Sequence, residues 1–418
     1  MMLLEKYSIG VGDRFGHQGV AQLRALKRAK DLGVNVVPVW NKSNREHMII
    51  GTRPSDTRRA ADEAVRGSEW KDSYYVDADH IGLKTVDPFL ECSNFFTLDV
   101  ADFIGMEADR STMESFMRSM GPMCGSVRIS GIPTPLAVNE KDLHAFASKY
   151  LLAVKEAGKI YRHISNGRAN QDFVVEISTD EASEPQSPME LYLILAAIAE
   201  ERIPIQTIAP KFTGKFLKGI DYVGDVVQFA KEFEEDLHVI AHAVNAFGLP
   251  RNLKLSVHSG SDKFSLYQLI HRAISGTHAG LHLKTAGTTW LEELIGIALS
   301  GAAGLDVAKV IYQKAYERID ELSKPYETVI AIDRQRLPSP REVSAWDSVR
   351  YVGALRHDQS NRSFNPHLRQ LLHVGFKVAA EMGDKYLHLL ETASEIVGQN
   401  VTDNLFRRHI SPIFLGRS

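Results

Sequence analysis

Tyr74-Tyr75-Val76-Asp77-Ala78-Asp79-His80 joins a short apolar run directly to carboxylates and an imidazole. A similar arrangement, in which a β-branched run ends in polar residues or glycine and a helical stretch follows, recurs through the first two thirds of the chain. Continuous apolar runs of this kind are typical of strands that are buried on both faces of a parallel sheet. The eight runs are Tyr7–Val11, Val34–Val39, Tyr74–Val76, Phe95–Val100, Phe173–Ile177, Ile203–Ile208, Lys254–Val257 and Leu281–Leu283.

Helical patterns lie between these runs. Val20–Leu32 carries one apolar stripe and ends at Gly33, and Ser187-Pro188 opens a helix that reaches about Glu201. Asp225–Phe247 and Ser265–Ser275 show the same periodicity. Strands that alternate with helices favour a barrel or a doubly wound sheet, and eight strands favour the barrel. The predicted fold class is therefore α/β, a (β/α)₈ TIM-type barrel.

The pattern changes after Leu283. Residues 290–418 are mainly helical in pattern, with one β-like run at Thr328–Ile332. We therefore predict a catalytic barrel domain over residues 1–289 and a helical extension, packed on the barrel, over residues 290–418.

The bulk composition is that of a globular protein. The chain has 418 residues, a formal net charge of −3 and 2 cysteines, so neither nucleic acid, nor an anionic membrane surface, nor a disulfide framework is indicated. A small anionic substrate and a homo-oligomer are both compatible with this composition. The N-terminal residues become charged too soon for a secretory signal and no apolar run reaches membrane-spanning length, which favours the cytoplasm.

Three of the predicted strands end near a histidine: His80, His258 and His282. Barrel enzymes place their catalytic groups at the C-terminal ends of the strands, where these imidazoles would meet. Neutral imidazole is a common ligand of divalent Zn, Mn, Ni, Co or Fe, and three ligands leave coordination positions open for substrate oxygens. We predict a divalent metal site, although a single histidine near a strand end is more often structural.

Carboxylates accompany the histidines at the same ends. Asp79 adjoins His80, Glu176 lies within an apolar run, and Glu181 follows it in a polar loop. An acid–base pair needs two carboxyl groups that flank the reacting carbon. Asp79 with either glutamate would meet that need.

Further charged residues at the strand ends are candidates for substrate binding. Cationic side chains there could bind a substrate carboxylate, and glycines around the end of the first strand would allow a ligand to approach the backbone. These candidates are Asp13, Arg14, Lys211, Asp262, Lys263 and Lys284. Lys284 also has a rival interpretation as a Schiff-base lysine, since it ends an apolar strand where desolvation would depress its pKa.

Five segments taken together, in this order and spacing, resemble the tagaturonate/fructuronate epimerase family over about residues 8–290. They are Gly12–Gly16, Val76–His80, Glu176–Glu181, Ala209–Phe212 and Ser256–Lys263. The resemblance implies a cytoplasmic enzyme of hexuronate catabolism that uses a divalent metal to interconvert D-tagaturonate and D-fructuronate. It departs at the start, where family members carry an additional segment ahead of Gly12, and this bears on the substrate more than on the fold.

Site roles also follow from the resemblance. Asp79 would be the proton acceptor, His80 a metal ligand, and His258 and His282 further ligands, with Glu176 or Glu181 as the proton donor. The two ketouronates differ at C4, which is β to the C2 ketone, and this favours a retro-aldol route over direct deprotonation of C4. The alternatives are a metal-dependent aldolase or isomerase of another keto sugar or sugar acid, a Schiff-base aldolase using Lys284, and a non-catalytic carbohydrate-binding protein.

Overall fold

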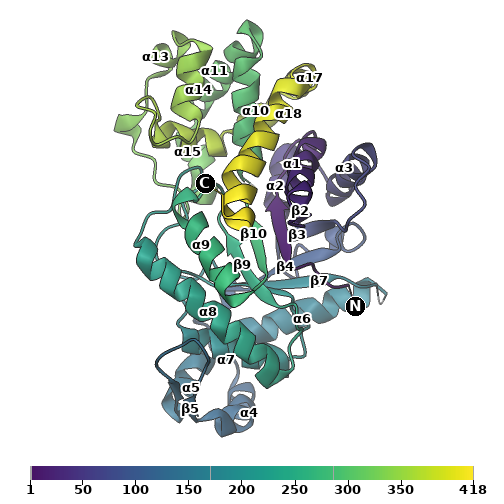
Figure 1. Ribbon diagram of the computed structural model, residues 1–418, viewed down its shortest axis with the longest axis vertical. Coiled ribbons are helices and arrows are strands. Elements are labelled where there is room, and N and C mark those ends of the chain that lie inside the picture. Colours follow the sequence, from purple (N-terminus) through teal and green to yellow (C-terminus); the bar gives the residue numbers. More distant parts are fainter. Residues whose placement is uncertain (1, 170, 286, 418) are drawn as a thin grey trace.

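Eight parallel strands close into a barrel in the computed structural model, which describes residues 2–169, 171–285 and 287–417. Each strand pairs with the next along the chain, and the last pairs with the first, which confirms the predicted TIM-type fold (Figure 1). The barrel strands are β1 (Tyr7–Val11), β2 (Val37–Ser43), β3 (Tyr75–Ile81), β4 (Phe95–Asp99), β7 (Val174–Ser178), β8 (Thr207–Ala209), β9 (Lys254–His258) and β10 (Leu281–Lys284).

All eight apolar runs therefore overlap a strand, but six strands extend past their runs, four of them by one residue and two by more. β2 continues to Ser43 and β3 to Ile81, so Asp77 and Asp79 lie within a strand rather than after it. An apolar criterion ends these strands too early, because the upper part of a barrel interior can face a polar site.

Four of the seven helices around the barrel form where their patterns predicted them, and the other three were not predicted individually. The helix at Pro188 begins with a reciprocal capping box between Ser187 and Glu190, and the helix at Val226 is capped by Asp225. The helices around the barrel are α1 (Gly19–Asp31), α2 (Asn44–Ile50), α3 (Pro54–Gly67), α6 (Leu152–Gly167), α7 (Pro188–Glu200), α8 (Val226–Phe247) and α9 (Phe264–Thr277).

An insertion between β4 and β7 was not predicted as separate elements. It extends away from the barrel at the bottom of Figure 1 and contains a short antiparallel pair of strands. Its elements are α4 (Arg110–Met120), β5 (Gly125–Val127), β6 (Leu136–Val138), α5 (Glu140–Phe146) and the π-helical turn Ala147–Leu151 that leads into α6.

The barrel interior changes character along its axis. One end is filled by an apolar plug in which Val39, Tyr75, Phe95 and Val174 pack with Leu4. Because side chains of a strand alternate between its two faces, the next inward positions of the same strands carry Asn41, Asp77, Thr97 and Glu176. The apolar end closes the barrel, and the polar end leads to the cavity described below.

The C-terminal region is helical, as predicted, and occupies the upper part of Figure 1. Its helices are α10 (Gly287–Leu299), α11 (Ala302–Glu317), α12 (Ile319–Ser323), α13 (Pro340–Ser344), α14 (Ser348–Leu355), α15 (Pro366–Val374), α16 (Phe376–Glu381), α17 (Asp384–Thr392), α18 (Ser394–Asp403) and the π-helical segment Asn404–Leu415. The predicted β-like run at Thr328–Ile332 is wrong, because these residues form a turn and a loop, in which Val329 O accepts from the N–H of Lys218 and Ala331 bonds to the side chain of Gln370.

The domain boundary at residues 289/290 stays a prediction. α10 runs across it, and the terminal segment Asn404–Leu415 returns to the barrel, where Leu405, Ile410 and Phe414 join the barrel's own apolar core. Among the described residues, no helix combines the length and hydropathy needed to cross a membrane.

Candidate active site

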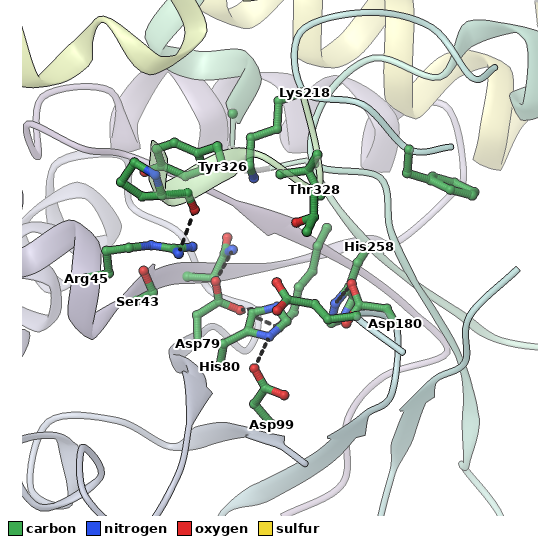
Figure 2. Close-up of a pocket in the computed structure, with 18 of the residues that line it drawn as sticks. Ser43, Arg45, Asp79, His80, Asp99, Asp180, Lys218, His258, Tyr326 and Thr328 are labelled. Atoms are coloured by element: carbon green, nitrogen blue, oxygen red, sulfur yellow. Dashed lines mark hydrogen bonds and ion pairs between the residues drawn. The ribbon is translucent and has the colours of Figure 1, made fainter. Parts of the chain in front are cut away.

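A cavity of about 800 Å³ opens at the C-terminal ends of the barrel strands. Figure 2 shows Asp79, His80, Asp99, Asp180 and His258 on one side of it and Lys218, Tyr326 and Thr328 on the other. The second side combines a loop of the barrel with a loop of the C-terminal helical region.

His80 has an unusual backbone conformation. Its φ is +50°, and the pairing of β3 with β4 shifts register between Ala78 and Ile81. Consecutive side chains of a regular strand point to opposite faces, whereas a bulge can direct a neighbour to the same side. Asp79 and His80 both line the cavity for this reason. Left-handed backbone at a non-glycine residue costs about 1–3 kcal/mol and is concentrated at functional sites.

His80, Asp180 and His258 form a group whose potential ligand atoms all lie within 4.8 Å of one another. The two imidazole rings have centroids 5.1 Å apart. Two imidazoles and one carboxylate suit a first-row divalent metal. The side chains of this group therefore fit the predicted metal.

Each histidine of the group is oriented by a carboxylate behind it. His258 Nε2 lies 2.8 Å from Glu176 Oε1, and His80 Nδ1 lies 3.3 Å from Asp99 Oδ2. His258 Nδ1 is buried and has no hydrogen-bond partner, although Asp180 Oδ2 is 3.2 Å away. A carboxylate that holds the far nitrogen of a histidine is the usual arrangement around a metal ligand. His258 Nδ1 and the carboxylate of Asp180 that faces it could therefore coordinate a shared cation.

The electrostatics of the group are dominated by its carboxylates. Burial alone would lower the pKa of each histidine, but Asp79 and Asp99 raise the pKa of His80 to about 10. Asp180 and Glu176 likewise raise the pKa of His258 to about 9. A site that attracts protons this strongly also attracts other cations.

Lys284 lies at the centre of a buried ionic network. Its Nζ is 2.8 Å from Asp79 Oδ1 and 2.9 Å from both Asp77 Oδ2 and Glu176 Oε1, and it donates to Thr97 Oγ1. Burial alone would lower the pKa of Lys284, but these three carboxylates raise it well above its usual value. The expectation of a depressed pKa at Lys284 was wrong, and with it the basis for a Schiff-base lysine.

The two candidate glutamates have different surroundings. Glu176 is fully buried between Lys284 and His258 and does not line the cavity. Glu181 does line the cavity, and burial raises the pKa of its carboxyl group. Of the two, Glu181 is the one whose side chain faces the space where a substrate would lie.

His282 is not close to the other two histidines. It lies two residues below Lys284 on β10, where its Nδ1 is 2.8 Å from Ser8 Oγ and its ring packs on Phe95 next to the apolar plug. Burial lowers the pKa of His282 to about 3. Asp180 takes the third place in the group that His282 was expected to fill.

Of the predicted substrate-binding residues, Arg14, Lys211 and Lys284 line the cavity and Asp13 does not. Asp13 accepts hydrogen bonds from the backbone N–H groups of Gly16, His17 and Gln18, and so shapes the loop before α1. In the structure Asp13 therefore stabilises this loop.

Asp262 and Lys263 are buried behind the cavity and do not line it. Asp262 is bound by Arg369 Nη2 at 2.7 Å and by His357 Nδ1 at 3.0 Å, both from the helical region. Lys263 Nζ donates to the carbonyl oxygens of Leu217 and Ile220. Sequence position placed these residues correctly at a strand end, but the turn after β9 directs them into the protein.

Sequence reasoning did not select Asp180, Asp99, Lys218 and Tyr326, which line the cavity. Asp180 lies inside the Glu176–Glu181 segment and Asp99 lies next to the end of the predicted run Phe95–Val100, so both carried a signal. Lys218 lies in the loop between β8 and α8 and Tyr326 in a short 3-10 helix, Lys324–Tyr326, and no local pattern distinguishes either residue.

Comparison with known proteins points in one direction. The sequence profile of the tagaturonate epimerase family matches residues 1–411. A tagaturonate/fructuronate epimerase of Thermotoga maritima is 27% identical, covering 96% of this chain and 80% of that protein.

Two crystal structures of a fructuronate-tagaturonate epimerase from Cohnella laeviribosi share the fold. The native one has a TM-score of 0.79 at 23% identity and covers 98% of this chain and 81% of its own. The complex with two glycerols has a TM-score of 0.80 at 23% identity, covering 99% and 83%. Since the profile match extends over nearly the whole sequence, the chain belongs to the tagaturonate epimerase family.

Proposed function

We propose that this protein interconverts D-tagaturonate and D-fructuronate by epimerisation at C4, with a divalent metal, as a step of hexuronate catabolism. Family membership supports the reaction. The observation that carries the proposal is the meeting of His80, Asp180 and His258 with Asp79 and Glu181 in one cavity.

The substrate itself restricts the mechanism. The two ketouronates differ at C4, which is β to the C2 ketone, so the ketone cannot delocalise a carbanion at C4. Removal of the C4 hydroxyl proton instead allows the C3–C4 bond to break, with its electron pair moving into a C2–C3 enediolate and an aldehyde forming at C4. Rotation of the aldehyde fragment and re-addition then give the other epimer.

Asp79 is the proposed proton acceptor for the C4 hydroxyl group. Burial would raise its pKa, but Lys284, His80 and His258 lower it, so Asp79 is ionised at neutral pH. Lys284 also fixes the carboxylate through the contact at 2.8 Å. An ionised, oriented carboxylate can accept a proton without first reorganising.

Glu181 is the proposed proton donor. A carboxyl group that is to deliver a proton near neutral pH needs a raised pKa, which burial gives to Glu181. Glu176 is better suited to orient His258 and Lys284, both of which it contacts.

His80, Asp180 and His258 would hold the metal, and Glu176 and Asp99 would orient the two imidazoles. A divalent cation bound there supplies a Lewis acid for the negative charge that develops on the substrate oxygens. His282 is left outside this ligand set.

The test is one assay with protein reconstituted in turn with Zn²⁺, Mn²⁺, Ni²⁺, Co²⁺ and Fe²⁺. With D-tagaturonate as substrate, NMR should show D-fructuronate as the product, and a chelator should abolish turnover. Accumulation of a free aldehyde would favour an aldolase instead. In D₂O, deuterium at C4 would exclude the retro-aldol route, because that route never breaks the C4–H bond.

A further inference from the structure

Lys218 extends into the cavity from the loop between β8 and α8, opposite the group formed by His80, Asp180 and His258 (Figure 2). We infer that Lys218, together with Arg14, forms the subsite that binds the carboxylate of the sugar acid. The inference rests on the proposed function for the identity of the ligand, and it names a residue that the strand-end pattern did not indicate.

Two of the other candidate cations are already engaged, whereas Lys211 also lines the cavity and has no ion pair among the described residues. Lys284 contacts three carboxylates, and Lys263 donates to backbone carbonyl oxygens. Within residues 2–169, 171–285 and 287–417, by contrast, the ammonium of Lys218 has no hydrogen bond and no ion pair. The ammonium instead lies over the ring of Tyr326, whose centroid is 5.5 Å from Nζ.

Arg14 also has donors to spare. One nitrogen, Nη2, lies 3.1 Å from Glu46 Oε1, and the guanidinium packs over Phe376. Its Nε and Nη1 are buried and have no hydrogen-bond partner among the described residues. The hydroxyl group of Tyr326 is buried and unpartnered in the same way. Buried donors without acceptors are costly, and a ligand with acceptor oxygens would satisfy them.

The ammonium of Lys218 lacks a paired counter-charge. Burial lowers the pKa of Lys218, and the charges that act on it are mixed: Glu46 and Glu181 raise the pKa, and Arg14 and Arg45 lower it. Glu46 is already paired with Arg14, so the carboxylate of a ligand would supply the counter-charge. The opposite side of the cavity is rich in carboxylates, including Asp79, which would repel a carboxylate of the substrate. The two sides together would orient a sugar acid in one direction, with its carboxylate toward Lys218 and its ketone toward the histidines.

The loop that carries Lys218 is held rigidly by its neighbours. The N–H of Lys218 donates to Val329 O at 2.8 Å, and the carbonyl oxygen of Leu217 accepts from Lys263 Nζ at 3.0 Å. Gly219, at φ +80°, donates to Ser261 Oγ at 2.8 Å and accepts from Arg369 Nε at 2.6 Å. Binding through a side chain on such a preorganised loop loses little entropy. Lys263 acts on the subsite indirectly, as a positioning residue.

The experiment separates charge recognition from turnover. Isothermal titration calorimetry compares D-gluconate, an acyclic sugar acid without a ketone, with sorbitol, which lacks the carboxylate. Wild-type protein should prefer gluconate. Lys218→Met should weaken gluconate binding by about 10- to 100-fold, the usual loss for a charge-assisted hydrogen bond, and leave sorbitol binding unchanged.

Lys218→Arg should retain part of the preference for gluconate, and Lys231→Met, on the exposed side of α8, should bind gluconate as the wild type does. In parallel, the KM of Lys218→Met for D-tagaturonate should rise by a similar factor while kcat stays within about threefold. Equal weakening of gluconate and sorbitol would show a structural defect and overturn the inference.

A wild-type protein without preference for gluconate would also overturn the inference, as would a Lys218→Met variant with unchanged gluconate affinity. If the wild type prefers gluconate but does not epimerise either ketouronate, the proposed function fails and the anion subsite stands. If it epimerises and Lys218→Met keeps the wild-type KM, the subsite fails alone.

Discussion

Asp79 links the buried ionic network to the candidate metal-binding group, since it contacts Lys284 at 2.8 Å and adjoins His80. Asp79→Asn keeps the shape of the side chain but removes the proton-accepting group. We expect kcat for D-tagaturonate to fall by about 10²- to 10⁴-fold, as for loss of a general base, with KM changed little. Steady-state kinetics would measure this, with the exposed Asp87→Asn as control. A wild-type kcat in Asp79→Asn would remove the assignment.

The ligand set can be tested by comparing two residues. Asp180→Asn should lower metal affinity by more than about 100-fold, since losing even an orienting partner of a ligand costs about 10- to 100-fold. His282→Gln should leave the affinity within about threefold, because His282 is bound to Ser8 in a lower layer of the barrel. Competition with a fluorescent chelator measures both affinities. The reverse result would restore His282 as a ligand in place of Asp180.

At the same scale, Asp79, His80 and His258 could be predicted because strand ends converge in a parallel barrel, and the structure does bring them together. The sequence could not show that Asp180, rather than His282, lies with His80 and His258. Side chains two residues apart on one strand face the same interior but occupy different layers, and only the layer next to the cavity reaches a ligand.

Among the elements, the eight strands and the helices from α7 to α9 were predictable, because the spacing of apolar residues, the helix-capping residues and Pro188 all indicate the same elements. The insertion with α4, α5 and the β5–β6 pair was not, because its strands have three residues each and lie outside the barrel. The bulge at His80 was also unpredictable, because positive φ is uncommon at any residue other than glycine and no local pattern marks the register shift.

The long helix α8 carries a buried carboxyl group whose effect on stability should depend on pH. Asp236 is 3% exposed on the apolar face of α8, and burial, together with Glu232 and Glu235, raises its pKa well above the usual value. The folded protein therefore keeps this proton at pH values where the unfolded chain, with a pKa of about 3.9, has lost it. Stability must fall as pH rises from about 4 through the folded pKa.

Asp236→Asn cannot titrate, so we expect it to be more stable than the wild type by about 1 kcal/mol or more at pH 8, and nearly equal at pH 4. Thermal melting from pH 4 to pH 8 gives the difference, and the exposed Asp306→Asn serves as control. A difference in Tm that does not grow with pH would contradict a raised pKa at Asp236.

For the whole molecule, the helical region completes the site as well as covering the barrel. Tyr326 and Thr328 come from it and line the cavity, and Val329 accepts a hydrogen bond from the loop that carries Lys218. These contacts join residues more than a hundred positions apart, so no pattern along the chain indicates them. The strand predicted at Thr328–Ile332 was wrong for a related reason. A β-branched run forms a strand only where another strand pairs with it, and this run lies in a turn and a loop.

The two regions are joined by a buried ionic cluster around Asp262, which also accepts from Thr288 at 2.9 Å and lies 3.2 Å from His409. Asp262→Asn would leave Arg369 buried without a counter-charge, and losing one partner of a buried pair destabilises by about 3–5 kcal/mol. Urea denaturation should show this loss.

The matched control for Asp262→Asn is Asp403→Asn, which breaks a contact of 2.9 Å between Asp403 and Arg28 that also joins the helical region to the barrel but is partly exposed. An exposed pair contributes about 1 kcal/mol or less, so this variant should be nearly as stable as the wild type. Equal, small losses in both variants would mean that the desolvation of Asp262 and Arg369 offsets their attraction. In that case the apolar contacts of Asn404–Leu415 with the barrel, rather than the Asp262 cluster, would hold the two regions together.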